Sequence, residues 1–553
     1  MLMIVGGVLI ALLGVALPTE WLAGPSAEGA RLQGVWLLRG ASLAVGTSLV
    51  GFGLGIRRSP ETPAPGRGPI PWPPLLAILL VALVLRLIGL DADLWYDEIV
   101  TLTEFVRLPA GELLTTYTVQ NNHILYSLSA KGSIALFGES AWALRLPAVL
   151  FGVASVGGVF YFGRRVASDR QALMAAALVA LAYHHVWFSQ NARGYTGLMF
   201  LGLIASGLFL DGMAQRRRSL WLAYAAVLAA GMYIHLSAVF LFLCHGLVYV
   251  GLWLWTLRSP ASAKRYPGAR ELWPLAGFVL GGLLTVEIYA LILPQMFETF
   301  GRTVSASTTL PGVGAWKSPL WTALEILGGL PGGLWTGAAV LAAGGIAAGA
   351  WLLLLRRDPA SALVMALPFP VTLAVLLAVQ FHIWPRYFFQ YMGFASLLLV
   401  QGAFVLMPVL LRQLGRDEAR APVFATWAIA AVILASAATL PANYRAPKQA
   451  YQATREFVES HRSPGDTVVT AGLATLPYER LYAPQWSSVA DAAELAQIER
   501  AGEGTWLIYS FPTYMRVAHE DILNAAKARY EEAAVFPGTL GDGALYVFHR
   551  SAR

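Results

Sequence analysis

The sequence PPLLAILLVALVLRLIGL, residues 73–90, is followed after three intervening residues by Leu94-Trp95-Tyr96-Asp97-Glu98. The apolar run is long enough to cross the hydrocarbon core of a bilayer as a helix. Two adjacent carboxylates just past such a span are expected at the membrane–water interface, where a group is partly desolvated and still reaches water. That position suits a general base. The alternative is that Asp97 and Glu98 only begin an exposed helix, whose positive N-terminal end favours acidic residues.

The whole chain has the composition of a polytopic membrane protein. Of its 553 residues, 57% are hydrophobic and 13% are charged, whereas soluble domains are about 45–50% apolar and about 25% charged. The net charge of +7 does not indicate nucleic acid, because the basic residues cluster in short loops between apolar runs, where they set membrane topology. The single cysteine, Cys244, excludes a disulfide framework or a CxxC site within the chain.

Apolar runs of spanning length predict an all-α membrane protein with about thirteen transmembrane helices. The first run has no basic segment before it and no small-residue cleavage site, which favours a retained span over a signal peptide. The runs lie near residues 1–17, 35–56, 73–90, 147–163, 170–188, 196–212, 219–235, 238–257, 273–293, 334–355, 361–380, 387–411 and 421–440.

The distribution of lysine and arginine predicts which loops face outward. If loop 57–72 is cytoplasmic, the six loops on its side hold 18 lysines and arginines, and the six opposite loops hold 9. Basic residues favour the cytoplasmic side. The loops 91–146 and 294–333 and the tail after Leu440 are therefore expected on the outer, periplasmic face of a bacterial cytoplasmic membrane.

Changes in composition divide the chain into three predicted domains. Residues 1–72 hold two extra N-terminal spans and a proline-rich cytoplasmic linker at 57–72, and residues 73–440 form the membrane core. Residues 441–553 alternate helical and strand patterns, which predicts a small soluble α/β domain. Its expected helices are 448–461, 489–501 and 515–529, and its expected strands are 466–471, 505–510, 532–536 and 544–549. It has neither GxGxxG nor a P-loop, so a structural lid or an acceptor-docking module is the expected role.

The first large outer loop, residues 91–146, is too long for a plain turn. Residues 109–117 and 123–137 within it have amphipathic helical spacing. We expect helices that lie along the membrane surface.

Polar residues gather at the predicted outer ends of several spans, and these form the candidate site. Taken singly, each has an ordinary explanation: an arginine can snorkel to the interface, and a lone histidine at a helix end is usually structural. Five groups on one face and none on the other are harder to explain in that way. Besides Asp97 and Glu98, the candidates are Asn122 (in the run Gln120–His123), His123, Tyr126, Gln190, Arg193, Tyr195, Tyr233, His235, Arg386 and Tyr387.

A carboxylate base, two arginines and surface helices at an outer interface suit a sugar carried on a lipid phosphate. Arginine holds phosphate oxygens with a bidentate fork and offsets charge on a leaving phosphate. A carboxylate near the sugar can take the proton from an acceptor hydroxyl as it attacks.

An ordered series of motifs extends this reading across residues 75–400. The motifs are RLIGLDADLWYDEIVT, NNHILYSL, ESAWALRLPAVLFGVASV, FSQNARGYTGLMFLGLIA, MYIHLSAVF and PRYFFQYMGF. Together they resemble the bacterial protein O-mannosyltransferase-like glycosyltransferases of the type C superfamily, and they are similar to its aminoarabinose and arabinofuranosyl transferases. The resemblance implies an integral-membrane, inverting transferase that uses a polyprenyl-phosphate sugar donor and a glycan, lipid or protein acceptor.

The resemblance also implies roles for individual residues. Asp97 would be the catalytic base and Glu98 its partner in positioning an acceptor or a metal. His123 and Tyr126 would belong to the substrate pocket, together with the remaining polar candidates of the outer face. Arg193 and Arg386 would contact the donor phosphate.

A divalent metal ion and two other functions stay open. Asp97, Glu98, His123 and His235 offer oxygen and nitrogen ligands, although their spacing matches no standard metal site. A transporter or lipid flippase would place charges inside the membrane, and Glu287 is the visible candidate for one. A non-enzymatic assembly protein that presents its tail outside would leave the ordered motifs unexplained.

Overall fold

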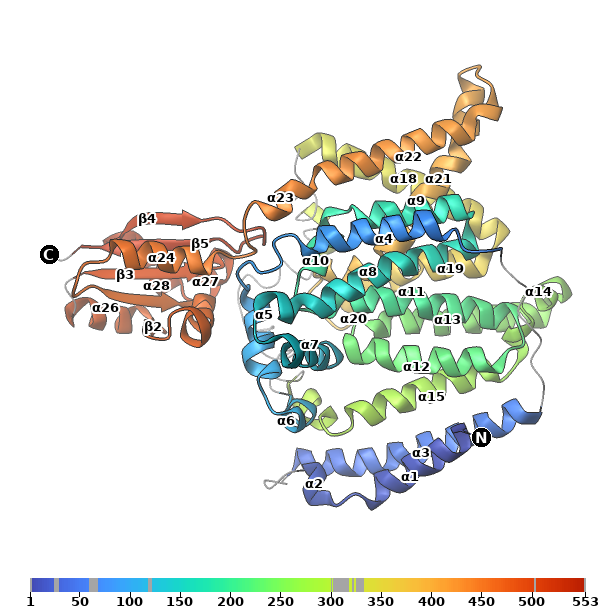
Figure 1. Cartoon of the computed structure of the whole chain (residues 1–553), viewed down its shortest axis with the longest axis horizontal. Coiled ribbons are helices and arrows are strands. Elements are labelled where there is room, and N and C mark those ends of the chain that lie inside the picture. Colours follow the sequence, from blue (N-terminus) through green and yellow to red (C-terminus); the bar gives the residue numbers. More distant parts are fainter. Residues whose placement is uncertain are drawn as a thin grey trace.

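The computed structural model describes residues 2–23, 29–58, 68–117, 122–299, 301, 318–320, 323–324, 333–501 and 504–551. The expected linker residues 59–67, most of the loop 294–333, and Gln120 and Asn121 lie outside the described residues. Within that part of the chain, the molecule is a bundle of long helices with a small α/β domain at one end (Figure 1).

The bundle begins with two helices that pack on each other and with a third that leads to the candidate site. They are α1 (Leu2–Ala16), α3 (Ala30–Arg58) and α4 (Trp72–Leu87), with the short α2 (Thr19–Ala23) between the first two. Close packing of α1 and α3 depends on small residues, as is common between membrane helices. A β-carbon on Gly7 would lie only 2.6 Å from the carbonyl oxygen of Gly46.

The loop after α4 folds into short helices at the end of the bundle. These are α5 (Tyr96–Thr101), the π-helical turn η1 (Leu102–Val106), α6 (Ala110–Thr115) and α7 (Ile124–Phe137). In Figure 1, α7 is seen nearly end-on while the bundle helices run across the view, so α7 lies across the bundle direction. The two helices expected within this loop are therefore present as α6 and α7.

The remaining bundle helices match the apolar runs of the sequence. They are α8 (Ala141–Val166), α9 (Asp169–Ala180), α10 (Tyr183–Ser189), α11 (Tyr195–Ala214), α12 (Arg218–Ile234), α13 (Ala238–Arg258), α14 (Pro260–Arg265), η2 (Pro267–Arg270), α15 (Trp273–Tyr289), α18 (Gly333–Arg357), α19 (Pro359–Ala366), α20 (Pro368–Ala378), η4 (Pro385–Tyr391), α21 (Met392–Gln413), η5 (Glu418–Arg420), α22 (Ala421–Ala438) and α23 (Leu440–Tyr444).

Local sequence explains several helix boundaries. The Ser140 side chain caps α8 by accepting a hydrogen bond from the amide of Ala143. Ser168 and Gln171 form a reciprocal capping box at the start of α9. The chain then bends by 64° between α9 and α10, which brings the residues after Ser189 toward the end of α4.

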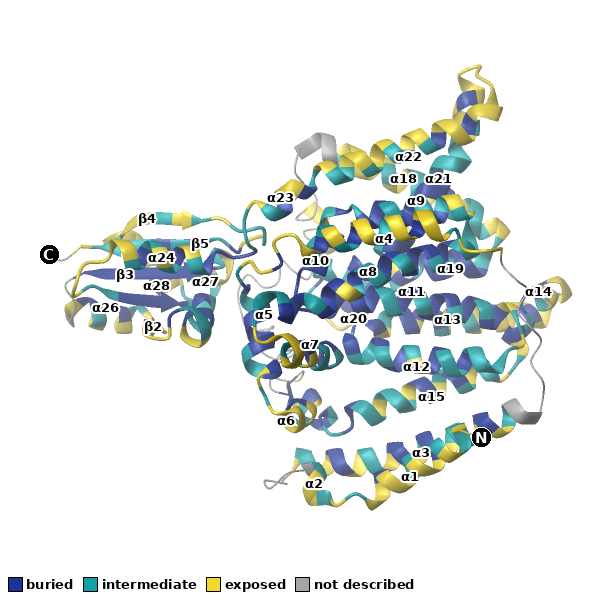
Figure 2. Ribbon diagram, in the orientation of Figure 1, coloured by how far each residue is buried: buried dark blue, intermediate teal, exposed yellow. Residues whose placement is uncertain are grey.

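The expected membrane architecture is confirmed. Seven described helices are long and apolar enough to cross a membrane, and up to ten if each of three bent helix pairs counts as one span. Every one of the thirteen apolar runs is helical, but some are short, so thirteen crossings stay a prediction. Helix faces on the outside of the bundle are apolar and exposed, as expected for faces toward lipid (Figure 2).

The C-terminal residues fold into the expected small α/β domain. Its elements are α24 (Tyr451–His461), β1 (Thr467–Ala471), η6 (Gly472–Ala474), α25 (Thr475–Pro477), η7 (Tyr478–Tyr482), β2 (Ser487–Val489), α26 (Ala492–Ala501), β3 (Thr505–Ser510), α27 (Pro512–Ala518), α28 (Glu520–Arg529), β4 (Glu531–Phe536) and β5 (Leu545–Arg550). The sheet order is β2-β1-β3-β5-β4, with β1 parallel to β2 and β3, and β5 antiparallel to β3 and β4. Strand β2 was missed because three residues carry too little pattern.

Both faces of this sheet are covered by helices. Because side chains alternate along a strand, Trp506 and Ile508 of β3 face one core, which includes Val458 of α24 and extends into the bundle. Leu507 and Tyr509 face a second core with α26, α27 and α28. The first core joins the domain to the helical bundle at the end that carries α5 (Figure 1).

Candidate functional site

Asp97 lies in the first turn of α5, at the end of the bundle that faces the C-terminal domain. Trp95 is the N-cap residue of this helix. A carboxylate in the first turn is favoured by the positive end of the helix. The Asp97 side chain keeps 15% of its surface exposed. It is therefore held by neighbouring residues and still accessible to a substrate.

Two arginines from distant parts of the chain meet this carboxylate. Arg386 Nη1, on η4, lies 3.5 Å from Asp97 Oδ2, and Arg193 Nη2, from the turn between α10 and α11, lies 4.0 Å from the same oxygen. Arg193 is almost completely buried, whereas 36% of the Arg386 side chain is exposed. The structure therefore brings the three residues with the strongest sequence-based roles into one cluster.

His123 and His235 form one wall beside Arg193. Their ring centroids are 4.3 Å apart, and Tyr195 packs against both rings. His123 Nε2 lies 3.1 Å from Arg193 Nη2, and His123 Nδ1 accepts a hydrogen bond from the amide of Gly194 at 2.9 Å. A side chain at Gly194 would collide with the carbonyl oxygen of Ile234 at 2.3 Å, so this close approach requires glycine.

Both imidazoles are neutral at neutral pH. Burial, aided by the nearby Arg193 and other cationic groups, lowers the pKa of His123 well below its ordinary value. Burial, with Arg193 and Arg386, also lowers the pKa of His235 to about 3. The cluster thus contains two fixed positive charges, one carboxylate and two uncharged rings, an arrangement that leaves positive charge available to an anion.

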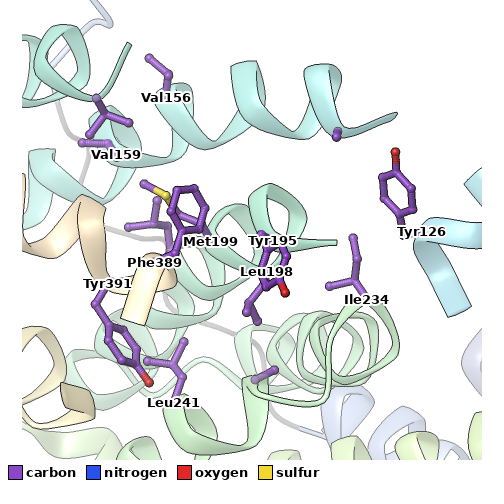
Figure 3. Packing of buried hydrophobic residues seen from close by; sticks show 14 of the residues in the cluster. Tyr126, Val156, Val159, Tyr195, Leu198, Met199, Ile234, Leu241, Phe389 and Tyr391 are labelled. Atoms are coloured by element: carbon purple, nitrogen blue, oxygen red, sulfur yellow. The ribbon is translucent and has the colours of Figure 1, made fainter. Parts of the chain in front are cut away.

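Tyr195 links this wall to Arg386. The Tyr195 side chain lies close to the Arg386 guanidinium, which also lies over the ring of Trp384 at 5.2 Å from the ring centroid. Tyr195 begins α11 and packs among apolar residues of the bundle, including Leu198 and Ile234 (Figure 3). The site therefore rests on a rigid part of the helical core.

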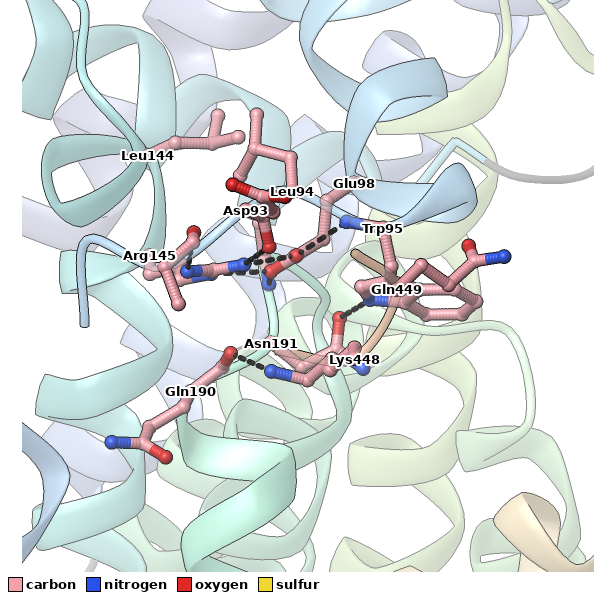
Figure 4. A network of polar contacts seen from close by, with 12 residues as sticks. Asp93, Leu94, Trp95, Glu98, Leu144, Arg145, Gln190, Asn191, Lys448 and Gln449 are labelled. Atoms are coloured by element: carbon pink, nitrogen blue, oxygen red, sulfur yellow. Dashed lines mark hydrogen bonds and ion pairs between the residues drawn. The ribbon is translucent and has the colours of Figure 1, made fainter. Parts of the chain in front are cut away.

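Glu98 faces away from the Asp97 cluster into a closed ion pair with Arg145. Its Oε1 accepts hydrogen bonds from Arg145 Nε at 2.8 Å and the amide of Ala192 at 2.7 Å. Its Oε2 accepts from Arg145 Nη2 at 2.6 Å and the amide of Trp95 at 3.2 Å (Figure 4). Burial alone would raise the pKa of Glu98, but the adjacent Arg145 guanidinium keeps that pKa below its usual value. Each oxygen already accepts two hydrogen bonds, which leaves no edge of the carboxylate for an acceptor or a metal.

Three further candidates are used for structure rather than exposed at the cluster. The fully buried Tyr126 donates its hydroxyl hydrogen bond to the carbonyl of Leu144 at 2.7 Å. Gln190 donates to the carbonyl of Ile88 at 2.6 Å and accepts from Asn443 Nδ2 at 2.7 Å. Asn122 is buried and accepts a hydrogen bond from a neighbouring serine in α7. These contacts tie helix ends together on the side of the bundle that carries Asp97.

The last two candidates lie at the border of the site. Tyr233 packs edge-on against Tyr289, with ring centroids 5.5 Å apart, in an apolar cluster with Tyr117. Tyr387 is half-buried next to Arg386 on η4.

Two residues that support the site were not among those singled out. Arg145 lies in the motif ESAWALRLPAVLFGVASV, and its position inside an apolar helix was the signal for a buried ion pair. Lys448 follows α23 and carried no signal in the sequence. Its Nζ donates to the carbonyl of Gln190 and lies 5.1 Å from the ring of Trp187 (Figure 4). Burial lowers the pKa of Lys448 to about 7.

The four residues considered as metal ligands do not form a metal site. Across the described ranges, no three histidine, cysteine, aspartate or glutamate residues gather closely enough to hold an ion. Glu98 is closed by Arg145, and the two ring nitrogens of His123 face Arg193 and the amide of Gly194. The two arginines beside Asp97 also disfavour the binding of a metal cation there.

Part of the chain matches a known protein family. Residues 123–266 match the family described as dolichyl-phosphate-mannose-protein mannosyltransferase. This segment contains His123, Arg193 and His235, and it lies between Asp97 and Arg386 in the sequence. The resemblance expected from the motifs is confirmed by this match. No curated protein matches the chain.

The chain is similar to several solved structures. ArnT from Cupriavidus metallidurans in the apo state has 15% sequence identity and a TM-score of 0.46, and the match covers 86% of this chain and 97% of that one. The same protein bound to undecaprenyl phosphate has 14% sequence identity and a TM-score of 0.47, with the same coverage of both chains. The oligosaccharyltransferase of Archaeoglobus fulgidus, tethered to an acceptor peptide, has 12% sequence identity and a TM-score of 0.47. This match covers 86% of this chain and 74% of that one.

Proposed function

We propose that this chain, whose residues 123–266 match the dolichyl-phosphate-mannose-protein mannosyltransferase family, is an inverting glycosyltransferase of the bacterial cytoplasmic membrane. The donor is a sugar on a polyprenyl phosphate, and the acceptor is a hydroxyl of a glycan, lipid or protein. The matched family is named for a sugar on dolichyl phosphate, which is itself an isoprenoid lipid phosphate. That name and the cationic cluster support a lipid-phosphate donor.

One observation carries the proposal: a reachable carboxylate held between two arginines at the end of a membrane bundle. Arg386 lies 3.5 Å and Arg193 4.0 Å from Asp97 Oδ2. A phosphate at this position would take the guanidinium groups as partners and leave the carboxylate to act as a base. Because Arg386 is partly exposed, it can turn toward a donor that enters from the lipid side.

The reaction needs one bond to form and one to break. The acceptor oxygen attacks the anomeric carbon of the sugar while the bond from that carbon to the phosphate oxygen breaks. Asp97 takes the proton of the acceptor hydroxyl, and the departing polyprenyl phosphate keeps the bonding electrons. Arg193 and Arg386 offset its charge, and the base contributes about 10²-fold to 10⁴-fold in rate.

Glu98 acts in this proposal through position rather than by contact with substrate. Its carboxylate joins Arg145 of α8 to the amides of Trp95 and Ala192. One of these amides belongs to the N-cap residue of the helix of Asp97, and the other belongs to the residue before Arg193. The ion pair therefore fixes the two sides of the cluster relative to each other.

In this proposal the active site lies on the outer face of the membrane. Residues 73–440 form the transferase core, residues 1–72 are an appended pair of spans with a linker, and residues 441–553 are a periplasmic domain. The loops on the side of the cluster hold 9 lysines and arginines against 18 on the other side. This bias supports an extracytoplasmic active site.

A transporter or lipid flippase is the second candidate, and Glu287 was its main support. Glu287 Oε1 accepts a hydrogen bond from Ser42 Oγ at 2.9 Å. The acid therefore joins α15 to the N-terminal α3, which lies at the edge of the bundle (Figure 1). This contact favours a packing role for Glu287 over a place on a transport path.

The experiment is donor turnover by the purified full-length protein in lipid nanodiscs. Radiolabelled mannose and arabinofuranose, each on undecaprenyl phosphate, are offered with glycan, lipid A and serine-containing peptide acceptors. Transfer of label to any acceptor, with release of undecaprenyl phosphate, supports the proposal. Movement of the labelled lipid between leaflets of proteoliposomes without cleavage would support the flippase instead.

A further inference from the structure

The C-terminal domain makes polar contacts to the main chain just before Asp97. The hydroxyl of Tyr482, in η7, accepts a hydrogen bond from the amide of Leu94 at 2.9 Å and donates one to the carbonyl of the same residue at 3.3 Å. Tyr482 also stacks on Tyr451 of α24, with ring centroids 5.4 Å apart. One hydroxyl of the C-terminal domain thus satisfies both main-chain groups of a residue three positions before Asp97.

A second link is a mutual exchange of helix caps. The first amide of α5, that of Tyr96, donates to Gln449 Oε1 at 2.9 Å, and the amide of Gln452 in α24 donates to Asp93 Oδ2 at 2.8 Å. Amides in the first turn of a helix have no partner within the helix. Each segment therefore supplies a hydrogen-bond acceptor for an amide at the start of a helix in the other segment. Both amides lose these acceptors if the two segments separate.

Gln449 is anchored firmly on the domain side. It is fully buried, its Oε1 also accepts the hydroxyl of Tyr451 at 3.1 Å, and its Nε2 donates to the carbonyl of Gly543 at 3.3 Å. The side chain has no freedom to follow α5 if that helix shifts. It acts as a fixed acceptor that sets the position of the Tyr96 amide.

The same segment also reaches the turn that carries Arg193. Lys448 Nζ donates to the carbonyl of Gln190 (Figure 4), and Asn443 Nδ2 donates to Gln190 Oε1 at 2.7 Å. Residues 443–449 therefore contact both sides of the cluster. Gln449 contacts the side of Asp97, and Lys448 contacts the side of Arg193.

Backbone strain marks the same boundary. Phe511 precedes α27 with φ of +54°, in the left-handed region that a bulky residue rarely occupies, and its ring lies edge-on to Tyr96 with centroids 6.2 Å apart. Such strain persists only where surrounding contacts hold it, and it is frequent at functional sites. One strained residue of the domain therefore packs against the first residue of α5.

We propose that the C-terminal domain positions the catalytic base, and that Tyr482 and Gln449 are the positioning residues. The inference rests on the proposed function of Asp97. Outside their own domain, the hydrogen bonds described for these two side chains go to the main chain of residues 94 and 96, so they fix the path of α5 without reaching the substrate. Because a displacement of about 1 Å can cost about 100-fold in rate, such contacts belong to the catalytic apparatus of the enzyme.

Paired tyrosine variants separate positioning from simple stability. Tyr482→Phe removes the hydroxyl that reaches Leu94. Tyr478→Phe is the matched control, since its hydroxyl is buried in the same aromatic stack and bonds to the carbonyl of Tyr451 within the domain at 3.3 Å. Gln449→Ala removes the second link, and Gln452→Ala, whose side chain bonds only to Glu456 at 3.0 Å among the described residues, is its control.

Two readouts are taken on the full-length protein: amide exchange of the peptide that spans residues 94–100, and kcat with donor KM for whichever undecaprenyl-phosphate sugar the native protein consumes. Each test variant removes the acceptor of one main-chain amide, that of Leu94 or that of Tyr96. Loss of such a hydrogen bond, about 1 kcal/mol, predicts about fivefold faster exchange in Tyr482→Phe and Gln449→Ala. Their kcat should fall about 10-fold with donor KM unchanged, while both controls behave as the native protein.

The outcomes are distinct. Unchanged exchange in both test variants, or faster exchange with native kcat, would overturn the positioning role. Equal losses in test and control variants would also overturn it, because they would reflect domain stability alone. If the native protein consumes no donor, the proposed function fails, and the exchange data still decide whether the domain holds the helix.

Discussion

The carboxylate of Asp97 lies 3.5 Å from the guanidinium of Arg386, although Asp97 follows the third apolar run of the chain and Arg386 precedes the last but one. Arg193 approaches the same oxygen from the middle of the sequence. The bundle therefore brings three charged side chains from three separate segments of the chain to one point at its end. Each prediction below tests how that point is held or used.

The buried pair of Glu98 and Arg145 should matter far more for stability than an exposed pair on the same outer loop. Glu98→Gln leaves the Arg145 charge buried and unpaired, which costs about 3–5 kcal/mol. Glu139→Gln breaks the pair with Arg107, whose side chains are 43% and 40% exposed, and should cost about 0–1 kcal/mol. Thermal unfolding of the two variants in detergent gives the comparison. Equal midpoints would mean that the Glu98 pair does not hold the site together.

Arg386 should act on the donor rather than on the fold. Arg386→Gln removes a charged hydrogen-bonding partner of the phosphate, worth about 1.5–3 kcal/mol, so kcat/KM for the donor should fall about 10-fold to 100-fold. Arg386→Lys keeps the charge but cannot make the bidentate hydrogen bonds of a guanidinium, so it should recover only part of the lost kcat/KM. Arg412→Gln, at the far end of the following helix α21 with an exposed partner, is the control. Equal rates for Arg386→Gln and Arg412→Gln would remove Arg386 from the donor site.

The histidine wall should make the protein sensitive to acid. An unfolded histidine titrates near pH 6.5, whereas folded His235 stays neutral down to about pH 3 because of burial and its cationic neighbours. Between these values the unfolded state binds the extra proton, so stability falls as pH falls, by about 1.4 kcal/mol per unit for each such group. His123 adds to the effect, since burial and Arg193 lower its pKa in the same direction.

Thermal midpoints between pH 7 and pH 5 measure this effect. The native protein should lose stability as the pH is lowered, and His235→Asn should lose less. His461→Asn, on the exposed surface of α24, should keep the full dependence. A native midpoint that does not change over this range would contradict the assignment of two neutral, buried rings.

The sequence predicted the charged cluster better than it predicted the roles of the residues around that cluster. Asp97, Arg193 and Arg386 each follow or precede an apolar run on the same predicted side, so their meeting could be expected from topology. The roles expected for Glu98 and Tyr126 could not be tested in that way, because adjacent residues in a helix point about 100° apart. Glu98 turns into the core toward Arg145, and Tyr126 toward the carbonyl of Leu144.

The contribution of the C-terminal domain could not be predicted for a different reason. Gln449 and Tyr482 carry no motif, and their partners are main-chain groups of residues 94 and 96. Main-chain partners leave no trace in the side-chain pattern of a single sequence. Composition predicted that a small α/β domain was present, and the three-dimensional structure was needed to see which part of the bundle it contacts.

The central claim is that Asp97 takes the proton of the acceptor, and the most direct measurement is single-turnover transfer by Asp97→Asn. The variant keeps the size of the side chain and removes the basic carboxylate. With native donor turnover as reference, the rate should fall about 10²-fold to 10⁴-fold, while undecaprenyl phosphate still binds with an affinity close to that of the native protein. Transfer at the native rate by Asp97→Asn, with the protein folded and the donor bound, would contradict the account.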